Sequence, residues 1–113
     1  MKVLYLENHR TFAATVCQQF LADAEVAVAV TVAEALGALR EGAFDVVLVD
    51  HDLDGEKGTD FVMQARAAGC RVPMVAVSSH DEGNEALRRA GANATCPKLR
   101  FHTIRTVLAT LGL

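Results

Sequence analysis

The chain has 113 residues, of which 51% are hydrophobic, and it carries a formal net charge of −3 at pH 7. This length fits a single domain, residues 1–113, with one hydrophobic core that needs no disulfide or metal. The acidic balance argues against a nucleic-acid-binding surface, because such surfaces are normally basic. No apolar run approaches the roughly 18 residues that a membrane span requires. The early acid Glu7 argues against a signal peptide.

Apolar periodicity predicts five strands that alternate with five helices. Short unbroken apolar runs, typical of strands buried on both faces, lie at residues 2–6, 24–30, 46–49, 72–77 and 92–96. Apolar residues at helical spacing, bounded by capping residues and glycines, predict helices at residues 10–22, 31–40, 59–68, 79–90 and 100–111. This alternation predicts one (βα)5 domain of the α/β class. Right-handed crossovers then give a doubly wound, parallel, five-stranded sheet with helices on both faces.

The cysteine pattern indicates reduced thiols. Cys17, Cys70 and Cys96 are odd in number and form no CxxC pair. Neither a disulfide framework nor a zinc motif is therefore indicated. Such cysteines are typically small packing residues in a reducing compartment. We expect a cytoplasmic protein whose cysteines pack in the core, with a reactive cysteine as the less favoured alternative.

The residues that follow the predicted strands are mostly acids, hydroxyls and one lysine. In chain order, these residues are Glu7 and Asn8 after the first strand, Asp50 and Asp52 after the third, Ser78 and Ser79 after the fourth, and Lys98 after the fifth. A parallel sheet brings these ends to one edge, where open α/β sheets bind their ligands.

This combination of side chains is typical of a site for a hard divalent cation and an oxyanion. Clustered carboxylates repel one another unless a cation or an ammonium group neutralises them. Mg²⁺ prefers one or two carboxylates and keeps its other positions for water and phosphate oxygens. Lys98 and Ser78 supply the groups that hold further phosphate oxygens. Asp50 is then either a metal ligand alone or also a nucleophile, since carboxylates can form aspartyl-phosphates.

Over the whole chain, these residues resemble, in order, the receiver domain of two-component response regulators. The segment from residue 2 to residue 8 is similar to the family's first strand with its trailing acid pair, and Asp50 stands at the phosphoacceptor position. Gly58 falls eight residues after Asp50, and Ser78 stands where the family has its hydroxyl. Lys98 lies seven residues after Gly91, in a segment similar to the family's fifth strand. Four matches in register across five βα units make this pattern specific.

The resemblance implies a flavodoxin-like strand order, 2-1-3-4-5, and a Mg²⁺-dependent transfer of a phosphoryl group to Asp50. It places the metal on Glu7, Asn8, the Asp50 carboxylate and the backbone carbonyl of Asp52. It also makes Lys98 the partner of the phosphoryl group.

In the family, the hydroxyl at the position of Ser78 is the activating switch. The implied donor is the phosphohistidine of a sensor histidine kinase or phosphotransfer protein. The output is then expected to pass to an unidentified downstream protein through the face of the fourth and fifth helices, and a homodimer through that face is a further expectation. Apart from this self-catalysed phosphotransfer and dephosphorylation, no conventional enzyme activity is indicated.

Four departures make this an atypical member of the pattern. Asn8 is neutral where the family has an acid that touches the metal. Leu99 replaces the proline after the lysine, and a cis peptide is costly there because a non-proline cis bond costs about 3 kcal/mol. Thr95 occupies the position of the switch aromatic, and the segment from Ser78 to Gly91 is about two residues short.

Two alternatives follow from these departures and from the acids themselves. The first is a pseudo-receiver, which keeps the fold as an interaction module but is not phosphorylated. The second is a metal-dependent nucleic-acid enzyme, because Glu7 and the segment 50–55 also look like the acid pattern of the Toprim domain. The acidic net charge and the in-register Ser78 and Lys98 oppose the second alternative. A transition-metal site on His9, His51 and His80 is not favoured, because their spacing matches no metal motif.

Overall fold

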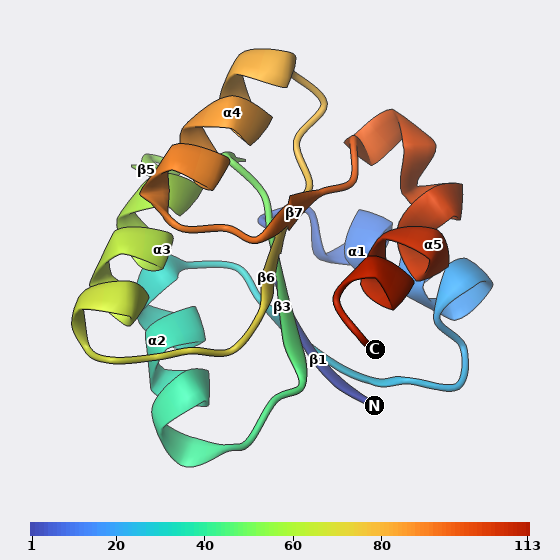
Figure 1. Ribbon diagram of the computed structural model, residues 1–113, viewed down its shortest axis with the longest axis horizontal. Helices are drawn as coiled ribbons and strands as arrows, with labels where there is room; N and C mark the ends of the chain where they lie inside the picture. Colours follow the sequence, from blue (N-terminus) through green and yellow to red (C-terminus); the bar gives the residue numbers. More distant parts are fainter.

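The computed structural model describes residues 1–113 and contains one five-stranded sheet covered by helices (Figure 1). The sheet consists of β1 (Lys2–Leu6), β2 (Glu25–Ala29), β3 (Val46–Val49), β6 (Met74–Ala76) and β7 (Ala94–Thr95). The helices are α1 (Arg10–Phe20), α2 (Val32–Glu41), α3 (Gly58–Ala67), α4 (Asp81–Ala90), the 3₁₀-helix η1 (Lys98–Thr103) and α5 (Ile104–Thr110). No helix is long and apolar enough to cross a membrane.

All strands of this sheet are parallel, in the order β2-β1-β3-β6-β7. Counting only these five strands, the order is 2-1-3-4-5, which confirms the predicted doubly wound α/β fold. Leu6 is in register with Val49, and Val49 with Ala76. The strands therefore end together, and the residues that follow them meet at one rim.

The core has two layers because each face of the sheet is covered separately. On one face, α2, α3 and α4 pack a cluster that includes Phe61, Val62 and Leu87. On the other face, α1, η1 and α5 pack a cluster in which Tyr5 stacks on Phe101 with ring centroids 5.9 Å apart. Figure 1 shows these two groups of helices on opposite sides of the sheet. The four residues of β3 are fully buried, as expected for the central strand.

All three cysteines are free thiols. Cys17 and Cys96 lie in the core beneath α1 and α5, and Cys70 packs at the edge of the other cluster. Burial raises the pKa of Cys17 to about 11 and also raises that of Cys96. These two thiols are therefore protonated at neutral pH, which agrees with the predicted packing role.

The elements differ from the predictions in three places. A hairpin of β4 (Asp52–Leu53) and β5 (Glu56–Lys57) was not predicted, because two-residue strands have no apolar periodicity to detect. The helix expected at 100–111 is wrong in its first half, where η1 precedes α5. Arg100 has non-helical dihedral angles there, and Phe101 turns into the core. The edge strands β2 and β7 are two and three residues shorter than predicted, since an edge strand has only one neighbour to pair with.

Candidate phosphoacceptor site

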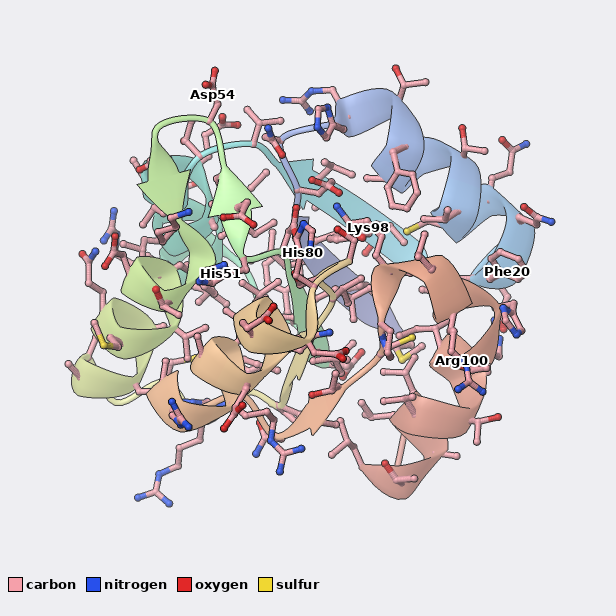
Figure 2. The ribbon with its side chains drawn as sticks, turned by 90° about the horizontal axis from the view of Figure 1, so that it is seen from above. Phe20, His51, Asp54, His80, Lys98 and Arg100 are labelled. Atoms are coloured by element: carbon pink, nitrogen blue, oxygen red, sulfur yellow. The ribbon has the colours of Figure 1, made fainter.

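The predicted site residues meet at the carboxyl edge of the sheet. Figure 2 looks toward this edge, with Lys98, His51 and His80 near its centre and Asp54 projecting from the tip of the β4–β5 hairpin. Glu7 follows β1, Asp50 follows β3 and Ser78 lies two residues beyond β6. Because β3 lies between β1 and β6, Asp50 sits between the other two positions. Glu7, Asp50 and Ser78 are all buried, with at most 4% of each residue exposed.

The backbone around Asp50 is held by the start of α3. The amide of Gly58 donates a hydrogen bond to the carbonyl of His51 at 2.8 Å. A Cβ atom at position 58 would lie 1.9 Å from the Asp50 carbonyl oxygen and 2.9 Å from Cγ1 of Val49. Only glycine fits this approach, which explains physically why a glycine follows Asp50 by eight residues.

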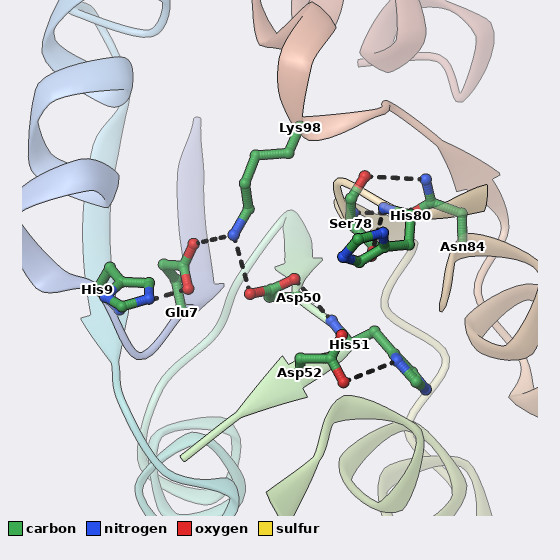
Figure 3. A network of polar contacts seen from close by, with 9 residues as sticks. All are labelled: Glu7, His9, Asp50, His51, Asp52, Ser78, His80, Asn84 and Lys98. Carbon is green, nitrogen blue, oxygen red and sulfur yellow. Dashed lines mark hydrogen bonds and ion pairs between the residues drawn. The ribbon is translucent and has the colours of Figure 1, made fainter. Parts of the chain in front are cut away.

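Lys98 links the two buried acids. Its Nζ atom donates hydrogen bonds to Oε1 of Glu7 at 2.6 Å and to Oδ2 of Asp50 at 2.9 Å, as Figure 3 shows. Only 16% of its side chain is exposed, and its ammonium group lies 5.1 Å from the centre of the Phe12 ring. The other Asp50 oxygen, Oδ1, accepts a bond from the backbone amide of His51 at 2.8 Å. The structure thus brings together a carboxylate, an ammonium group and a second carboxylate.

The electrostatics of this cluster are set by burial and by charge. Burial raises the pKa of Asp50 to about 6, an effect that Lys98 opposes and Glu7 reinforces. Burial alone would lower the pKa of Lys98, but its hydrogen bonds to Glu7 and Asp50 raise it overall. With all three groups ionised, two carboxylates share one ammonium ion, and the cluster keeps a net charge of −1. The site therefore favours a further cation.

Ser78 is held through its backbone by Asn84 of α4. The Ser78 amide donates to Oδ1 of Asn84 at 2.8 Å, and Nδ2 of Asn84 donates to the Ser78 carbonyl at 3.1 Å. The same carbonyl accepts the backbone amide of Lys98 at 2.9 Å. The Ser78 hydroxyl accepts the amide of His80 at 3.1 Å. The hydroxyl predicted as the switch therefore belongs to the most firmly bonded residue of the β6–α4 connection.

The other two predicted metal ligands, Asn8 and Asp52, differ in burial and in hydrogen bonding. Asn8 carries a buried Oδ1 atom that has no hydrogen-bond partner. Asp52 directs its half-exposed carboxylate toward Lys57 and His51, away from Asp50, so only its backbone carbonyl remains for a metal at the rim. No three acidic, histidine or cysteine side chains converge on one ion position. A metal here would rest on Asp50 and Glu7 together with neutral oxygens of Asn8 and the Asp52 backbone.

These neutral and charged oxygens fit Mg²⁺. An unpartnered, buried amide oxygen is costly unless a donor or cation completes it. The excess negative charge beside it supplies the attraction, and Mg²⁺ needs only one or two carboxylates from the protein.

The departures seen in the sequence have visible consequences around the site. No peptide bond is cis, including the one that precedes Leu99, and the Leu99 side chain is 84% exposed. Thr95 is half-buried within β7. The α4 helix keeps ten residues despite the short connection before it. The first turn of α4 lies directly against the site, because a Cβ atom at position 83 would lie 2.6 Å from the Ser78 hydroxyl oxygen.

Sequence reasoning missed two residues that shape this region. Asn84 gave no signal because a single polar residue in a helix is usually exposed, whereas it is 5% exposed here. Arg66 of α3 donates hydrogen bonds to the carbonyls of Cys70, Val72 and Gly91 and to the side chain of Asn93. It joins the end of α3 to the segment that leads into β7, and nothing in its sequence neighbourhood distinguishes it from a solvated arginine.

Comparison with known proteins agrees with this geometry. Residues 3–99 match the family described as the response regulator receiver domain, and the chain therefore belongs to that family. Family membership favours the receiver interpretation over the Toprim-like alternative. No curated protein matches the sequence.

Solved structures of receiver domains share the fold at low sequence identity. A CheY-like receiver domain protein from Methanospirillum hungatei is 20% identical with a TM-score of 0.82, over 98% of this chain and 93% of that one. The response regulator TrrA from Thermotoga maritima, solved with Mg²⁺ and BeF, is 16% identical with a TM-score of 0.85, over 97% of both chains. The chemotaxis protein CheY4 from Vibrio cholerae is 24% identical with a TM-score of 0.80, over 98% of this chain and 95% of that one.

Proposed function

We propose that Asp50 accepts a phosphoryl group from the phosphohistidine of a sensor kinase or phosphotransfer protein. The observation that carries this proposal is the contact of Lys98 Nζ with the buried carboxylates of Glu7 and Asp50, at 2.6 and 2.9 Å. It supports phosphotransfer because an ammonium group touches the nucleophile itself, at the edge where parallel α/β sheets bind ligands. The match to receiver domains over residues 3–99 supports the same conclusion.

The transfer requires one bond to form and one to break. An oxygen of Asp50 attacks phosphorus, and the phosphorus–nitrogen bond of the donor breaks, its electron pair passing to the imidazole. The freed imidazole takes its proton from solvent. Lys98 offsets the charge on the phosphoryl oxygens, and the Ser78 hydroxyl donates a hydrogen bond to one of them. The domain contributes mainly positioning and charge neutralisation, as expected for phosphoryl transfer.

A bound Mg²⁺ would supply positive charge that stabilises the negative charge developing on the phosphoryl oxygens. Asp50, Glu7, the Asn8 amide oxygen and the backbone carbonyl of Asp52 are the groups that would hold it. The unpartnered Oδ1 of Asn8 and the net charge of the cluster support this assignment. Because Asn8 carries no charge, we expect weaker Mg²⁺ binding than an acid at this position would give.

A second function, that of a pseudo-receiver, is favoured by a specific pair of observations. Asn8 supplies a neutral amide to the metal side, and Asp52 pairs with Lys57 and not with the cluster. Both reduce the charge available to a cation. A domain of this kind would bind its partner without phosphorylation.

One experiment separates the two functions. The purified domain is incubated with Mg²⁺ and acetyl phosphate, and intact mass is measured at short times. A phosphoreceiver gains one phosphoryl group, Asp50→Asn abolishes the gain, and Asp54→Asn leaves it unchanged because Asp54 projects from the hairpin tip. If the unmodified domain gains no mass and binds no beryllofluoride, phosphotransfer is refuted and the interaction module remains.

The output of the domain is proposed to be a protein–protein contact in the cytoplasm. The face formed by α4 and α5 is the proposed contact surface, because Asn84 of α4 is hydrogen-bonded to Ser78. A homodimer through the same face is tested by sedimentation with and without beryllofluoride.

A further inference from the structure

The first turn of α4 is hydrogen-bonded to Ser78, the residue that carries the hydroxyl of the site, through the side chain of Asn84. The side-chain amide forms a closed pair of hydrogen bonds with the backbone of Ser78, 2.8 Å to its N–H and 3.1 Å to its carbonyl. Both residues are buried, with 5% of Asn84 and 1% of Ser78 exposed. Such a paired amide fixes both the position and the orientation of the backbone it binds.

This side chain takes the place of a missing bond in the sheet. The amides of Cys96 and Lys98 donate to the carbonyls of Ala76 and Ser78, at 2.8 and 2.9 Å, which continues the parallel ladder beyond β7. In a regular parallel ladder, the Ser78 amide would donate to the Cys96 carbonyl between these two bonds. It donates to Asn84 instead. At the point where the β6–β7 ladder reaches the site, a helix side chain therefore replaces a backbone carbonyl as the acceptor of one hydrogen bond.

The hydrogen bonds of Asn84 are also connected to Lys98. The Ser78 carbonyl accepts from both Asn84 Nδ2 and the backbone amide of Lys98. One oxygen atom thus joins the residue that carries the hydroxyl, the residue that carries the ammonium group and the start of α4. Figure 3 shows Asn84 behind Ser78, on the side away from Asp50, so Asn84 does not itself reach the reacting atoms.

The neighbouring Gly83 allows α4 to approach this closely. A Cβ atom at position 83 would lie 2.6 Å from the Ser78 hydroxyl oxygen and 3.0 Å from Cβ of His51, the residue after Asp50. The helix backbone therefore rests on both Ser78 and the Asp50 loop. This close packing is independent of the hydrogen bonds of Asn84, and both place the first turn of α4 against the site.

We propose that Asn84 is a positioning residue for phosphotransfer, which holds the Ser78 hydroxyl at the place where a phosphoryl group on Asp50 meets it. This inference rests on the proposed phosphotransfer function. Loss of the amide frees the Ser78 backbone, so the hydroxyl is no longer presented in one orientation. Misplaced catalytic groups lower rates by about ten-fold or more even where binding is unaffected. Glu7 and Asn8, on the metal side of the site, follow β1 and make no hydrogen bond to Asn84.

The test is a double-mutant cycle on the rate of phosphorylation by acetyl phosphate. Asn84→Ala is expected to lower the rate constant about ten-fold in the unmodified background and less than about two-fold in a Ser78→Ala background. The apparent Mg²⁺ affinity, measured by the dependence of that rate on Mg²⁺, is expected to stay unchanged. A purely structural role would lower the rate equally in both backgrounds, and that outcome overturns the proposal.

The matched control is Asn93→Ala. Oδ1 of Asn93 accepts the amide of Met74 at 2.8 Å, the same kind of bond at the opposite end of β6. We expect it to change the rate less than two-fold, and an equal loss for both variants overturns the assignment. If Asn84→Ala does not fold, Asn84→Asp, which keeps the oxygen acceptor for the Ser78 amide, replaces it in the cycle with the same expected non-additivity.

Failure of the inference and failure of the proposed function give different results. If the unmodified domain is phosphorylated but the effects of Asn84→Ala and Ser78→Ala are additive, the inference alone fails. If the unmodified domain is not phosphorylated, the proposed function fails, and the reaction that Asn84 would serve is absent, so the inference falls with it.

Discussion

Replacing Lys98 by methionine should reveal how strongly the site depends on one buried cation. The substitution keeps a long side chain but removes the ammonium group that contacts Glu7 at 2.6 Å and Asp50 at 2.9 Å. At most 6% of either acidic side chain is exposed, so both carboxylates stay in a poorly hydrated place without a partner. Breaking a buried ion pair from one side typically costs 3–5 kcal/mol. Because 16% of the lysine side chain reaches solvent, we expect about 3 kcal/mol at pH 8.

The loss should depend on pH with a definite sign. Removing the ammonium group raises the folded-state pKa of Asp50 further above its ordinary value, because Lys98 lowers this pKa against the opposite effects of burial and Glu7. Below that pKa the Asp50 carboxyl is neutral and the unpaired charge disappears. The destabilisation caused by Lys98→Met is therefore largest at pH 8 and falls to about 1 kcal/mol near pH 5. The measurement is the free energy of unfolding in urea at both pH values.

Lys57→Met is the matched control. Lys57 also forms an ion pair, with Asp52, but the two side chains are 56% and 52% exposed. Exposed ion pairs contribute about 0–1 kcal/mol, so this variant should lose little stability at either pH. The reasoning is refuted if Lys98→Met costs no more than Lys57→Met, or if its cost is the same at pH 5 and pH 8. Glu7→Gln in the Lys98→Met background should restore part of the loss, since it removes one of the two stranded charges.

Three further predictions concern neighbouring residues, each measured by urea unfolding. Gly58→Ala should cost about 3 kcal/mol because its Cβ would overlap the Asp50 carbonyl. Gly37→Ala, whose Cβ would meet only Nη2 of Arg40 at 4.0 Å, should gain about 0.5–1 kcal/mol, and equal effects would contradict the overlap. The raised pKa of Asp50 makes the folded state bind more protons than the unfolded state between pH 3.8 and about 6. This group's contribution to stability therefore falls by about 3 kcal/mol as pH rises through that window. Asp50→Asn should abolish that fall, and an unchanged pH profile would contradict it. Arg66→Ala should lower the free energy of unfolding by about 2–3 kcal/mol, because its hydrogen bonds to three backbone carbonyls are lost. Arg71 is exposed, so Arg71→Ala should cost under about 0.5 kcal/mol, and similar losses for both variants would show that the carbonyl contacts contribute little.

Glu7 and Asn8 show which details of the site the sequence leaves open. The sequence places Glu7 and Asn8 together at the end of the first strand, and the family pattern assigns both to the metal. In the structure, Glu7 points to Lys98, whereas the amide oxygen of Asn8 is buried without a partner. Adjacent residues of an extended chain point in different directions, so a pattern in sequence cannot say which of two neighbours faces the lysine.

The residues alone were enough to predict the layered α/β fold and which candidate site residues follow its strands. Unbroken apolar runs identify buried strands, and the parallel arrangement that follows from their alternation with helices sends Asp50, Ser78 and Lys98 to one edge. These conclusions need only local periodicity and chain order, both of which are visible in the residues.

The contacts that fix the backbone around that edge could be seen only in the folded structure. Three contacts join segments whose separation depends on how α3 and α4 pack on the sheet. They are the hydrogen bonds of Asn84 to Ser78, the close approach of Gly83 and the hydrogen bonds of Arg66. A buried amide and an exposed one look the same in sequence, because burial is a property of the packed helix and not of the residue. For that reason the meeting of the candidate site residues at one edge could be predicted from the sequence, whereas the contacts of Asn84, Gly83 and Arg66 could not.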